Sequence, residues 1–226
     1  MLDKNKSIVI IQARCSSKRL PSKVLLPINN IPIIILAVKR AANKGRKIIV
    51  ATSNHPSDDR LVKLLIKERI SFFRGSLNNV LSRFAHIVKN SNPNQIIFRL
   101  TADNIFPDGN LLDELEKHFN KKKLEYLACG RNSGLPYGLS VELTKAKHIF
   151  EANKKSISKF DKEHVTPFIR RKYKNYCFTK YKNFKMEHYR CTIDTLDDYK
   201  LIKNIFKNLK QNSIKISFKT LLPKIF

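Results

Sequence analysis

The sequence predicts an α/β protein with a largely parallel sheet that is covered by helices on both faces. Short apolar runs alternate along the chain with longer segments whose apolar residues recur at helical spacing, which is the pattern of this architecture. The clearest runs are IVII, KIIVAT and QIIFRL, which are rich in the β-branched residues that strands favour. The 226 residues include only 6 Gly and 9 Pro, which are scattered and form no linker. We therefore expect one domain over residues 1–226.

The first half of the chain predicts regularly alternating strands and helices. A helix from Ile31 to about Asn43 has proline in its first turn, where the missing N–H costs little. Ser57 is the expected cap of the next helix, whose leucines share one face. The other expected elements are strands over Ile8–Ile11, Lys47–Thr52, Ser71–Arg74 and Gln95–Leu100, and helices over Asn78–Lys89 and Asn110–Asn120.

The pattern becomes less regular after Leu124. We expect residues 124–190 to form a lid or a dimerisation arm within the single domain, because Gly and Pro interrupt the strand signals in the loop RNSGLPYG. The chain then returns to a strand and a final helix. The expected elements are strands over Leu124–Cys129, Leu139–Leu143 and Tyr189–Ile193, and helices over Glu163–Tyr173 and Leu196–Leu209.

The chain is strongly basic, with 45 Lys+Arg against 18 Asp+Glu and a net charge of +27. Such a charge suggests nucleic acid or a membrane surface as a partner. However, the lysines are spread over predicted helix faces, and they accompany abundant Asn and Ile, as the codon usage of an A/T-rich genome would give. No helix-turn-helix, RRM or zinc-finger pattern is present. We expect no specific nucleic-acid partner, only weak adhesion at low salt.

The cysteines and the apolar runs bear on the cellular compartment. The four cysteines lie far apart with no C-x-x-C pair, so we expect reduced thiols and neither a zinc knuckle nor a redox motif. The N-terminus MLDKNKSIVII lacks the apolar core and cleavage site of a signal peptide. The longest apolar run, Ile31–Val38, is too short to span a bilayer. We therefore expect a cytoplasmic protein without membrane insertion.

A basic loop follows the first predicted strand and contains Arg14, Lys18, Arg19 and Lys23. Loops after buried strands are where α/β proteins hold nucleotides. An arginine fork and a mobile lysine charge together suit a triphosphate, although the loop lacks the glycines of a P-loop or a G-x-G-x-x-G motif. The alternative is a solvated surface turn, the usual fate of a charge cluster.

Two acidic residues, Asp103 and Asp194, each follow a predicted strand directly. Because neighbouring strand ends open into one crevice, the two side chains could meet and hold one Mg²⁺, which keeps other positions for water and phosphate. The alternative is an Asx-turn or a helix N-cap. For Asp194 this alternative is weaker, because Thr195 is the better cap and Asp198 completes an acidic capping box.

The segment IIQARCSSKRLPSKVLLPI resembles the N-terminal signature of the cytidylyltransferases that activate acidic sugars, I-[PQ]-A-R-x-x-S-x-R-L-P-G-K. With its Gln, it is most similar to the branch named for spore-coat polysaccharide biosynthesis protein F. The resemblance covers nearly the whole chain in the family's order. It continues through VATSNHPSDDRLV, FRGSLNNVLSRF, FRLTADNIFPD, LPYGLSVEL, DKEHVTPFIRR and CTIDTLDDYKLI.

The resemblance implies a nucleotide-diphospho-sugar transferase fold, a Rossmann-like three-layer sandwich. It also implies a reaction in which a sugar hydroxyl attacks the α-phosphate of CTP, releasing pyrophosphate and leaving a CMP-sugar for surface-glycan synthesis. Arg14 and Lys23 match the family's triphosphate-binding positions and are the expected catalytic residues. Asp103 and Asp194 match its Mg²⁺ ligands. The segments that line the nucleotide pocket contain Ala13, Ser53 and Arg83.

The resemblance also bears on the sugar and on assembly. Glu142 stands at an acidic position of the family and is a candidate for binding sugar hydroxyls; the alternative is an exposed strand residue. His164, in DKEHVTPF, could contact the sugar or a partner subunit; the alternative is a packing or surface residue. A homodimer is expected from the resemblance alone.

The sequence departs from the family pattern at five positions. Glycine is the usual residue where Ser16, Ser22 and Ala102 stand, and acidic residues are usual where Tyr137 and Ser140 stand. Because glycine permits positive φ, a strained Ser22 costs on the order of 1 kcal/mol or more. Serine could instead donate its hydroxyl to phosphate. The changes at positions 137 and 140 leave the sugar open, whether sialic, legionaminic, pseudaminic or another acidic sugar.

Three classes of function follow from these observations. The first is a Mg²⁺-dependent cytidylyltransferase, whose nucleotide could be other than CTP. The second is a noncatalytic relative that keeps nucleotide or partner binding. The third is a basic nucleic-acid-binding protein, which requires affinity that survives moderate salt.

Overall fold

The computed structural model describes residues 7–225. The first six residues of the segment considered as a signal peptide lie outside the described residues. A central six-stranded sheet has the order β5-β4-β1-β6-β8-β7. The first four strands in that order are parallel, and β8 is antiparallel to both of its neighbours, which confirms the largely parallel sheet. The strands are β1 (Ile8–Gln12), β4 (Lys47–Ser53), β5 (Phe72–Gly75), β6 (Ile96–Thr101), β7 (Tyr126–Cys129) and β8 (Val141–Lys145).

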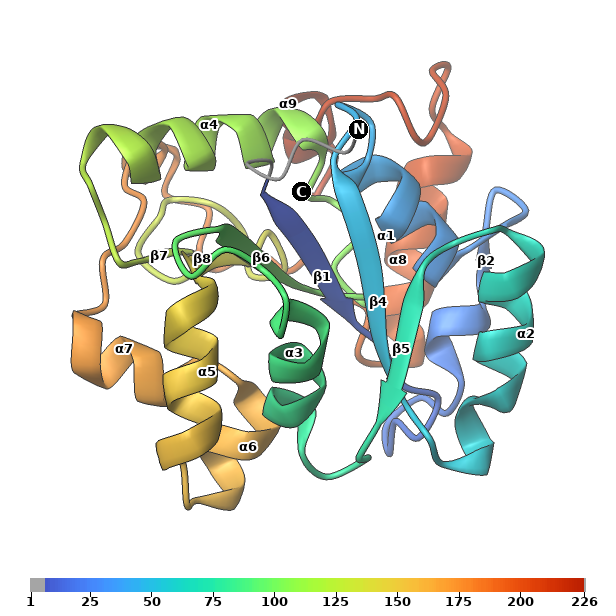
Figure 1. Ribbon diagram of the computed structural model, residues 1–226. Coiled ribbons are helices and arrows are strands. Elements are labelled where there is room, and N and C mark those ends of the chain that lie inside the picture. The colour runs from blue at the N-terminus through green and yellow to red at the C-terminus, as the bar shows by residue number, and fades with distance from the viewer. Residues whose placement is uncertain (1–6, 226) are drawn as a thin grey trace.

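Helices cover both faces of this sheet and give it three layers (Figure 1). One face packs on α1, α2, α4, α8 and α9, and the other on α3, α5 and α7. The helices are α1 (Ile33–Ala41), α2 (Asp59–Lys67), α3 (Val80–Val88), α4 (Gly109–Lys121), α5 (Ala146–Lys155), α6 (Lys159–His164), α7 (Pro167–Tyr173), α8 (Leu196–Lys207) and α9 (Phe218–Leu221). A short hairpin of β2 (Pro27–Ile28) and β3 (Ile31–Pro32) precedes α1, so the helix expected from Ile31 begins two residues later.

The apolar run of β1 explains its central position. Val9 and Ile11 belong to one of the two core clusters, while Ile8 and Ile10 belong to the other. Successive strand residues point to opposite faces of a sheet, so a strand that is buried on both faces must be apolar at every position. The sequence IVII therefore specifies a strand between two helical layers.

The helix predicted over Glu163–Tyr173 ends at the predicted residue but is not continuous, because α6 ends at His164 and α7 begins at Pro167. Val165 ends α6 with a positive φ of 68°, and Pro167 begins α7 at its first turn. Proline has no N–H to continue a helix and disfavours helical geometry in the residue before it. The sequence TP within this segment is the signal that divides the helix.

The strand predicted over Tyr189–Ile193 is also wrong. This segment runs beside the loop at Tyr137 rather than in the sheet: the Tyr137 N–H donates to the Tyr189 carbonyl at 2.9 Å, and the Cys191 N–H donates to the Tyr137 carbonyl at 2.7 Å. Because its partner is an irregular loop, the backbone pairing does not extend beyond these two hydrogen bonds into a strand.

Two further expectations differ from the structure. Ser57 does not cap α2, because it lies within a 3₁₀ turn (Pro56–Asp58) before that helix, and its N–H donates to His55 Nδ1 at 3.2 Å. The helix α5 was not predicted, although Ile149 and Ala152 place a buried stripe on it. In the first case, the turn formed by His55 and Ser57 takes the place of the expected helix cap.

Residues 124–190 are part of the main body of the protein. The strands β7 and β8 complete the central sheet, and α5 packs against α3 on one of its faces (Figure 1). A role of this region as a lid or dimerisation arm stays a prediction. In residues 7–225, no helix is both long enough and apolar enough to cross a bilayer.

Candidate active site

The residues singled out from the sequence gather at the edge of the sheet where the parallel strands end. The basic loop follows β1, Ser53 is the last residue of β4, and Asp103 lies two residues after β6. In open α/β sheets this carboxyl edge is where ligands bind.

Lys23 lies at the centre of this edge and joins the two predicted metal ligands. Its Nζ donates to Asp103 Oδ2 at 2.7 Å and to Asp194 Oδ1 at 3.0 Å. A third bond, to the Ile193 carbonyl at 2.7 Å, satisfies the last of the three ammonium protons. The Lys23 side chain is only 9% exposed, so these charges interact largely out of water. Carboxylates 91 positions apart in the sequence therefore meet at one cation.

Two arginines complete the surroundings of Asp194. Arg19 Nη2 lies 3.0 Å from Asp194 Oδ1, and Arg190 Nη2 lies 3.4 Å from Asp194 Oδ2. Arg19 belongs to the basic loop predicted from the sequence, where no partner was assigned to it, and Arg190 was not predicted as a site residue. The i,i+4 spacing of Arg190 and Asp194 is the one signal that could have suggested that pair.

The start of α8 fixes the backbone of Asp194. Thr195 is the N-cap and forms the predicted capping box with Asp198. Asp198 Oδ2 accepts the N–H groups of Asp194 and Thr195, both at 2.9 Å. Burial disfavours the charged form of Asp198, but these bonds and Arg190 outweigh burial and lower the pKa of the carboxyl. Because Thr195 and Asp198 perform the capping, the side chain of Asp194 is free to bind Lys23.

Ser22 shapes the loop that carries Lys23. It is left-handed, with φ 56° and ψ 20°, as expected for a position where glycine is usual. Its N–H donates to the Cys15 carbonyl at 2.8 Å and closes the loop.

Burial raises the pKa of the Cys15 thiol to about 11, with Asp58 adding to the effect, so the thiol stays protonated at neutral pH.

Arg14 points away from the carboxylates and toward α6. Its Nη2 lies 3.3 Å from Glu163 Oε1, and the two side chains are 43% and 49% exposed. Exposed pairs of this kind contribute only about 0.2–1 kcal/mol, so a phosphate could displace Glu163 at small cost. The structure brings Lys23, Asp103 and Asp194 together, whereas Arg14 lies at the side of this centre.

A buried carboxylate that the sequence analysis missed, Asp58, connects the basic loop to β4. It accepts the Cys15 N–H at 2.7 Å through one oxygen and the Ser53 hydroxyl at 2.5 Å through the other. The Ser53 hydroxyl is therefore engaged inside the protein. Ala13 continues the connection, because its N–H donates to the Ala51 carbonyl at 3.1 Å. The acidic start of a helix directly after a strand, SNHPSDD, was the available signal.

Arg83 is buried behind the same edge. Its Nη1 donates to the Ala51 carbonyl at 3.1 Å, and burial lowers the pKa of the guanidinium to about 10, against the opposing effect of Asp58. Its Nε has no hydrogen-bond partner among the described residues. A contact of Ala13, Ser53 or Arg83 with a nucleotide stays a prediction.

Glu142 is an interior residue, so the interpretation as an exposed strand residue is wrong. It faces Arg99 across the β6–β8 pair and is bonded by Arg99 and Tyr126. Thr166 Oγ1 donates to it at 2.7 Å. Burial disfavours the charge, but Arg99, Tyr126 and Thr166 outweigh it and lower the pKa of Glu142. The carboxylate thereby anchors the segment between α6 and α7.

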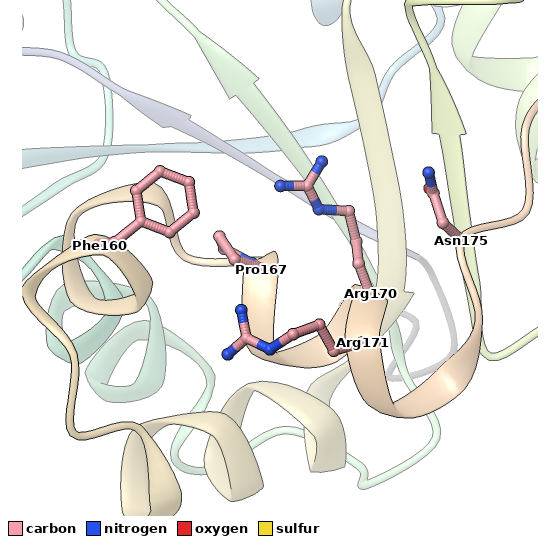
Figure 2. Close-up of a pocket in the computed structure, with 5 residues that line it drawn as sticks. All are labelled: Phe160, Pro167, Arg170, Arg171 and Asn175. Carbon is pink, nitrogen blue, oxygen red and sulfur yellow. The ribbon is translucent and has the colours of Figure 1, made fainter.

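His164, at the end of α6, is exposed and contacts the Phe160 ring at 4.5 Å between centroids. Partial burial is the main cause that lowers its pKa. A cavity of about 290 Å³ opens nearby, lined by Phe160, Pro167, Arg170, Arg171 and Asn175 (Figure 2). The figure shows both arginines extending from α7. Binding of sugar by Glu142 or His164 stays a prediction.

A larger cavity, of about 410 Å³, lies beside Asp194. It is formed by the loop after β7 and by the segment before Asp194, and the two segments are joined by the backbone bonds of Tyr137. Arg190 belongs both to this cavity and to the surroundings of Asp194. Its lining residues are Gly130, Arg131, Leu135, Tyr137, Glu187, His188 and Arg190.

The donor set fits a magnesium ion that is shared with phosphate. Within residues 7–225 no group of three His, Cys, Asp or Glu side chains is placed to hold a metal by itself. Asp103 and Asp194 are two carboxylates that share one cation, Lys23. Mg²⁺ is commonly held by one or two carboxylates plus water and phosphate oxygens, so two carboxylates are sufficient where a substrate provides the rest.

The chain is similar to known proteins over most of its length. It is 34% identical over 215 residues to the spore coat polysaccharide biosynthesis protein SpsF of Bacillus subtilis (strain 168), covering 90% of this chain and 87% of that protein. It is 33% identical over 217 residues to the uncharacterized protein MJ1063 of Methanocaldococcus jannaschii, covering 93% of this chain and 87% of that protein.

Solved structures show the same fold. A cytidylyltransferase from Leptospira borgpetersenii superposes with a TM-score of 0.86 at 26% identity, covering 97% of this chain and 92% of that one. A CMP:2-keto-3-deoxy-manno-octonic acid synthetase, solved with CTP, superposes with a TM-score of 0.64 at 14% identity, covering 89% of this chain and 98% of that one. The second likeness concerns the fold alone. Together they confirm the predicted nucleotidyltransferase fold.

The family assignment rests on the sequence profile as well as on these relatives. The profile of the cytidylyltransferases matches residues 8–219, a span that contains the basic loop and both carboxylates. The chain therefore belongs to the cytidylyltransferase family.

Proposed function

We propose that the protein transfers CMP from CTP to an acidic sugar, with Mg²⁺ as cofactor and with release of pyrophosphate. The observation that supports this most directly is the Lys23 ammonium held between Asp103 and Asp194, at the end of a loop with further cations. Two carboxylates, a buried lysine and flanking arginines form a site for a metal-bound polyphosphate. Family membership supports CTP as the nucleotide.

In the proposed reaction, a sugar hydroxyl oxygen attacks the α-phosphorus of CTP. The bond from the α-phosphorus to the oxygen that bridges to the β-phosphorus breaks, pyrophosphate leaves with that electron pair, and the hydroxyl proton passes to solvent. Asp103 and Asp194 would hold the Mg²⁺, which supplies positive charge to the phosphate oxygens. Lys23 and Arg14 bind the triphosphate and neutralise charge that develops on it.

The proposed binding of nucleotide implies a rearrangement of side chains. Lys23 exchanges the carboxylates for phosphate oxygens, and Arg14 exchanges Glu163 for the nucleotide. The backbone of Asp194 stays in place, because the capping box of α8 holds it.

The acidic sugar is supported by relatives. A 3-deoxy-manno-octulosonate cytidylyltransferase of Wigglesworthia glossinidia brevipalpis is 29% identical to the chain over 152 residues, and the spore-coat relative is named for polysaccharide biosynthesis. By analogy with these two relatives, we propose that the acceptor is a sugar acid and that the product is used in surface polysaccharide synthesis. A cytoplasmic homodimer belongs to the same proposal.

The test is pyrophosphate release from CTP and a sugar acid in the presence of Mg²⁺. We expect Asp103→Asn and Asp194→Asn each to lower the rate by about a hundredfold or more, because each removes a charged group that would hold the metal at the reacting phosphate. Asp197→Asn is the matched control, since this side chain of the same α8 turn is 94% exposed. Full activity in both variants would refute the metal assignment.

A noncatalytic nucleotide-binding relative is the second candidate, and the strained Ser22 in the phosphate loop favours it. Its distinguishing result is thermal stabilisation by CTP without turnover over a broad panel of sugars. A nucleic-acid-binding function would require affinity that survives moderate salt.

A further inference from the structure

The cavity beside Asp194 lies at the same sheet edge as the carboxylates. The strand β7 runs parallel to β6, since both are antiparallel to β8, so β7 ends at the edge where β6 ends. The cavity residues Gly130 and Arg131 directly follow β7, and Tyr137 lies shortly before β8. The cavity therefore opens on the β8–β7 side of the site, whereas the basic loop follows β1.

Arg190 connects this cavity to the carboxylates. Its guanidinium lies 5.2 Å from the centroid of the Tyr137 ring and reaches Asp194 Oδ2 at 3.4 Å. Asp194 is bonded on its other oxygen by Lys23 and Arg19, from the basic loop. Asp194 thus lies between the proposed phosphate loop and the cavity, in the place where a nucleotide and an acceptor must meet.

The chemistry of the lining indicates what the cavity could bind. Leu135 and Tyr137 provide apolar surface, and Glu187 accepts the Gly134 N–H at 3.0 Å through Oε1. The second oxygen of Glu187 remains for a hydroxyl. Arg131 and Arg190 bring two positive charges to the lining and Glu187 brings one negative charge, so these three side chains sum to +1. Its volume, about 410 Å³, suits a monosaccharide-sized ligand and falls in the range of roughly 300–1,000 Å³ for small-molecule sites.

The two arginines of the lining differ in their ion pairs. Arg190 pairs with Asp194 and Asp198, whereas Arg131 has no carboxylate partner among residues 7–225. A planar guanidinium on the wall of a pocket is suited to bidentate binding of a carboxylate.

We propose that this cavity binds the acceptor of the transfer and that Arg131 contacts the carboxylate of a sugar acid. The inference rests on the proposed function for the identity of the second substrate. It differs from the positions considered from the sequence, because the carboxylate of Glu142 is already bonded by Arg99, Tyr126 and Thr166. Arg131 is thereby a specificity-determining residue, and the Glu187 carboxylate is placed for a sugar hydroxyl.

The experiment measures binding and needs no turnover. N-acetylneuraminate and 3-deoxy-manno-octulosonate, each as the free acid and as its methyl ester, are titrated by calorimetry into the protein saturated with α,β-methylene-CTP and Mg²⁺. We expect the wild type to bind at least one acid about tenfold or more tighter than its ester. In Arg131→Gln this preference disappears and ester binding is kept, while Arg131→Lys retains part of the preference.

Arg69→Gln is the matched control, because Arg69 is exposed and lies after α2, outside the cavity. Loss of acid and ester binding alike, an unchanged preference in Arg131→Gln, or no acid bound by the wild type would overturn the assignment. Affinity for α,β-methylene-CTP is titrated separately and reports on the proposed function. If the protein binds the analogue but shows no Arg131-dependent preference, the proposed nucleotide site stands and only the proposed acceptor site is refuted.

Discussion

Lys23 acts as an internal counter-ion for the two carboxylates of the site. Asp103 and Asp194 would repel each other if both were charged and close together without a cation, and the ammonium between them removes that repulsion. The same ammonium must yield before a metal ion can approach both carboxylates. Phosphate is the alternative partner of Lys23, so nucleotide binding would draw the ammonium away from the carboxylates. Lys23 would therefore couple metal binding to nucleotide binding.

This coupling predicts the behaviour of Lys23→Met. Without nucleotide, we expect the variant to bind Mn²⁺, used as a paramagnetic substitute for Mg²⁺, about tenfold tighter than the wild type, because no ammonium competes for the carboxylates. CTP should bind more weakly for lack of the charge. Lys39→Met is the control, since it removes an exposed pair with Glu68. Electron paramagnetic resonance measures free Mn²⁺ directly, and an unchanged or weaker affinity in the folded variant would contradict the competition.

Ser22 predicts a gain in stability on replacement by glycine. Its φ of 56° costs a serine on the order of 1 kcal/mol more than a glycine. We expect Ser22→Gly to raise the melting temperature by roughly 2–4 °C, the shift that 1 kcal/mol gives in a protein of this size. Ser17→Gly, in the same loop but without positive φ, should not stabilise. Equal shifts in the two variants would mean that strain at Ser22 is not the cause.

At the residue scale, the sequence placed Asp103 correctly because it follows the sheet strand β6. Asp194 was paired with it through a predicted strand that does not form, and it reaches the same edge from the irregular segment before α8. Asp58 and Arg190 could not be placed, since their partners depend on how the loop from Cys15 and the segment before α8 fold back. These are contacts of tertiary structure that no local periodicity encodes.

At the scale of elements, the loop before β8 depends on a close approach between backbones. Gly138 has φ 114°, and a Cβ there would lie 2.6 Å from both the Cys191 carbonyl carbon and the Thr192 nitrogen. Only glycine permits this contact, which holds Tyr137 and the segment preceding Asp194 together. The geometry of the cavity beside Asp194 therefore depends on one glycine.

Gly138→Ala tests this dependence against Gly45→Ala. Gly45 also has positive φ, 77°, but a Cβ there meets nothing within 4 Å, so its substitution measures the conformational cost alone, about 1 kcal/mol. We expect Gly138→Ala to cost about 1–3 kcal/mol more than that, the usual penalty of overpacking. Urea unfolding of both variants gives the difference. Equal losses of stability would show that the approach to Cys191 relaxes without penalty.

The sequence predicted the repeating elements better than the irregular ones. Apolar strands such as Lys47–Ser53 and the helix that begins at Leu196 have strong local signals, in the buried run and the capping box. The break at Val165 depends on a proline and on a residue with positive φ, and the extended segment before Asp194 depends on a loop partner. These features interrupt the periodic spacing of apolar residues, so that spacing does not predict them.

At the scale of the whole molecule, the shortage of acidic residues shapes the electrostatics. With 45 basic and 18 acidic residues, most cations cannot have a counter-ion of their own, and the acids are shared. Glu114 lies 2.8 Å from Lys180 and 2.9 Å from Lys219, just as Asp194 is shared among Lys23, Arg19 and Arg190. From these unpaired surface cations we expect adhesion to polyanions at low salt without a specific site.

In the function we propose, one sheet edge binds CTP on the side of the basic loop and a sugar acid on the side of β8. The most direct test is a pyrophosphate-release screen of the four nucleoside triphosphates against a panel of sugar acids, with and without Mg²⁺. We predict release with CTP and at least one sugar acid, dependent on Mg²⁺, and little with the other triphosphates. No release from CTP with any sugar acid, or equal release from all four triphosphates, would contradict it.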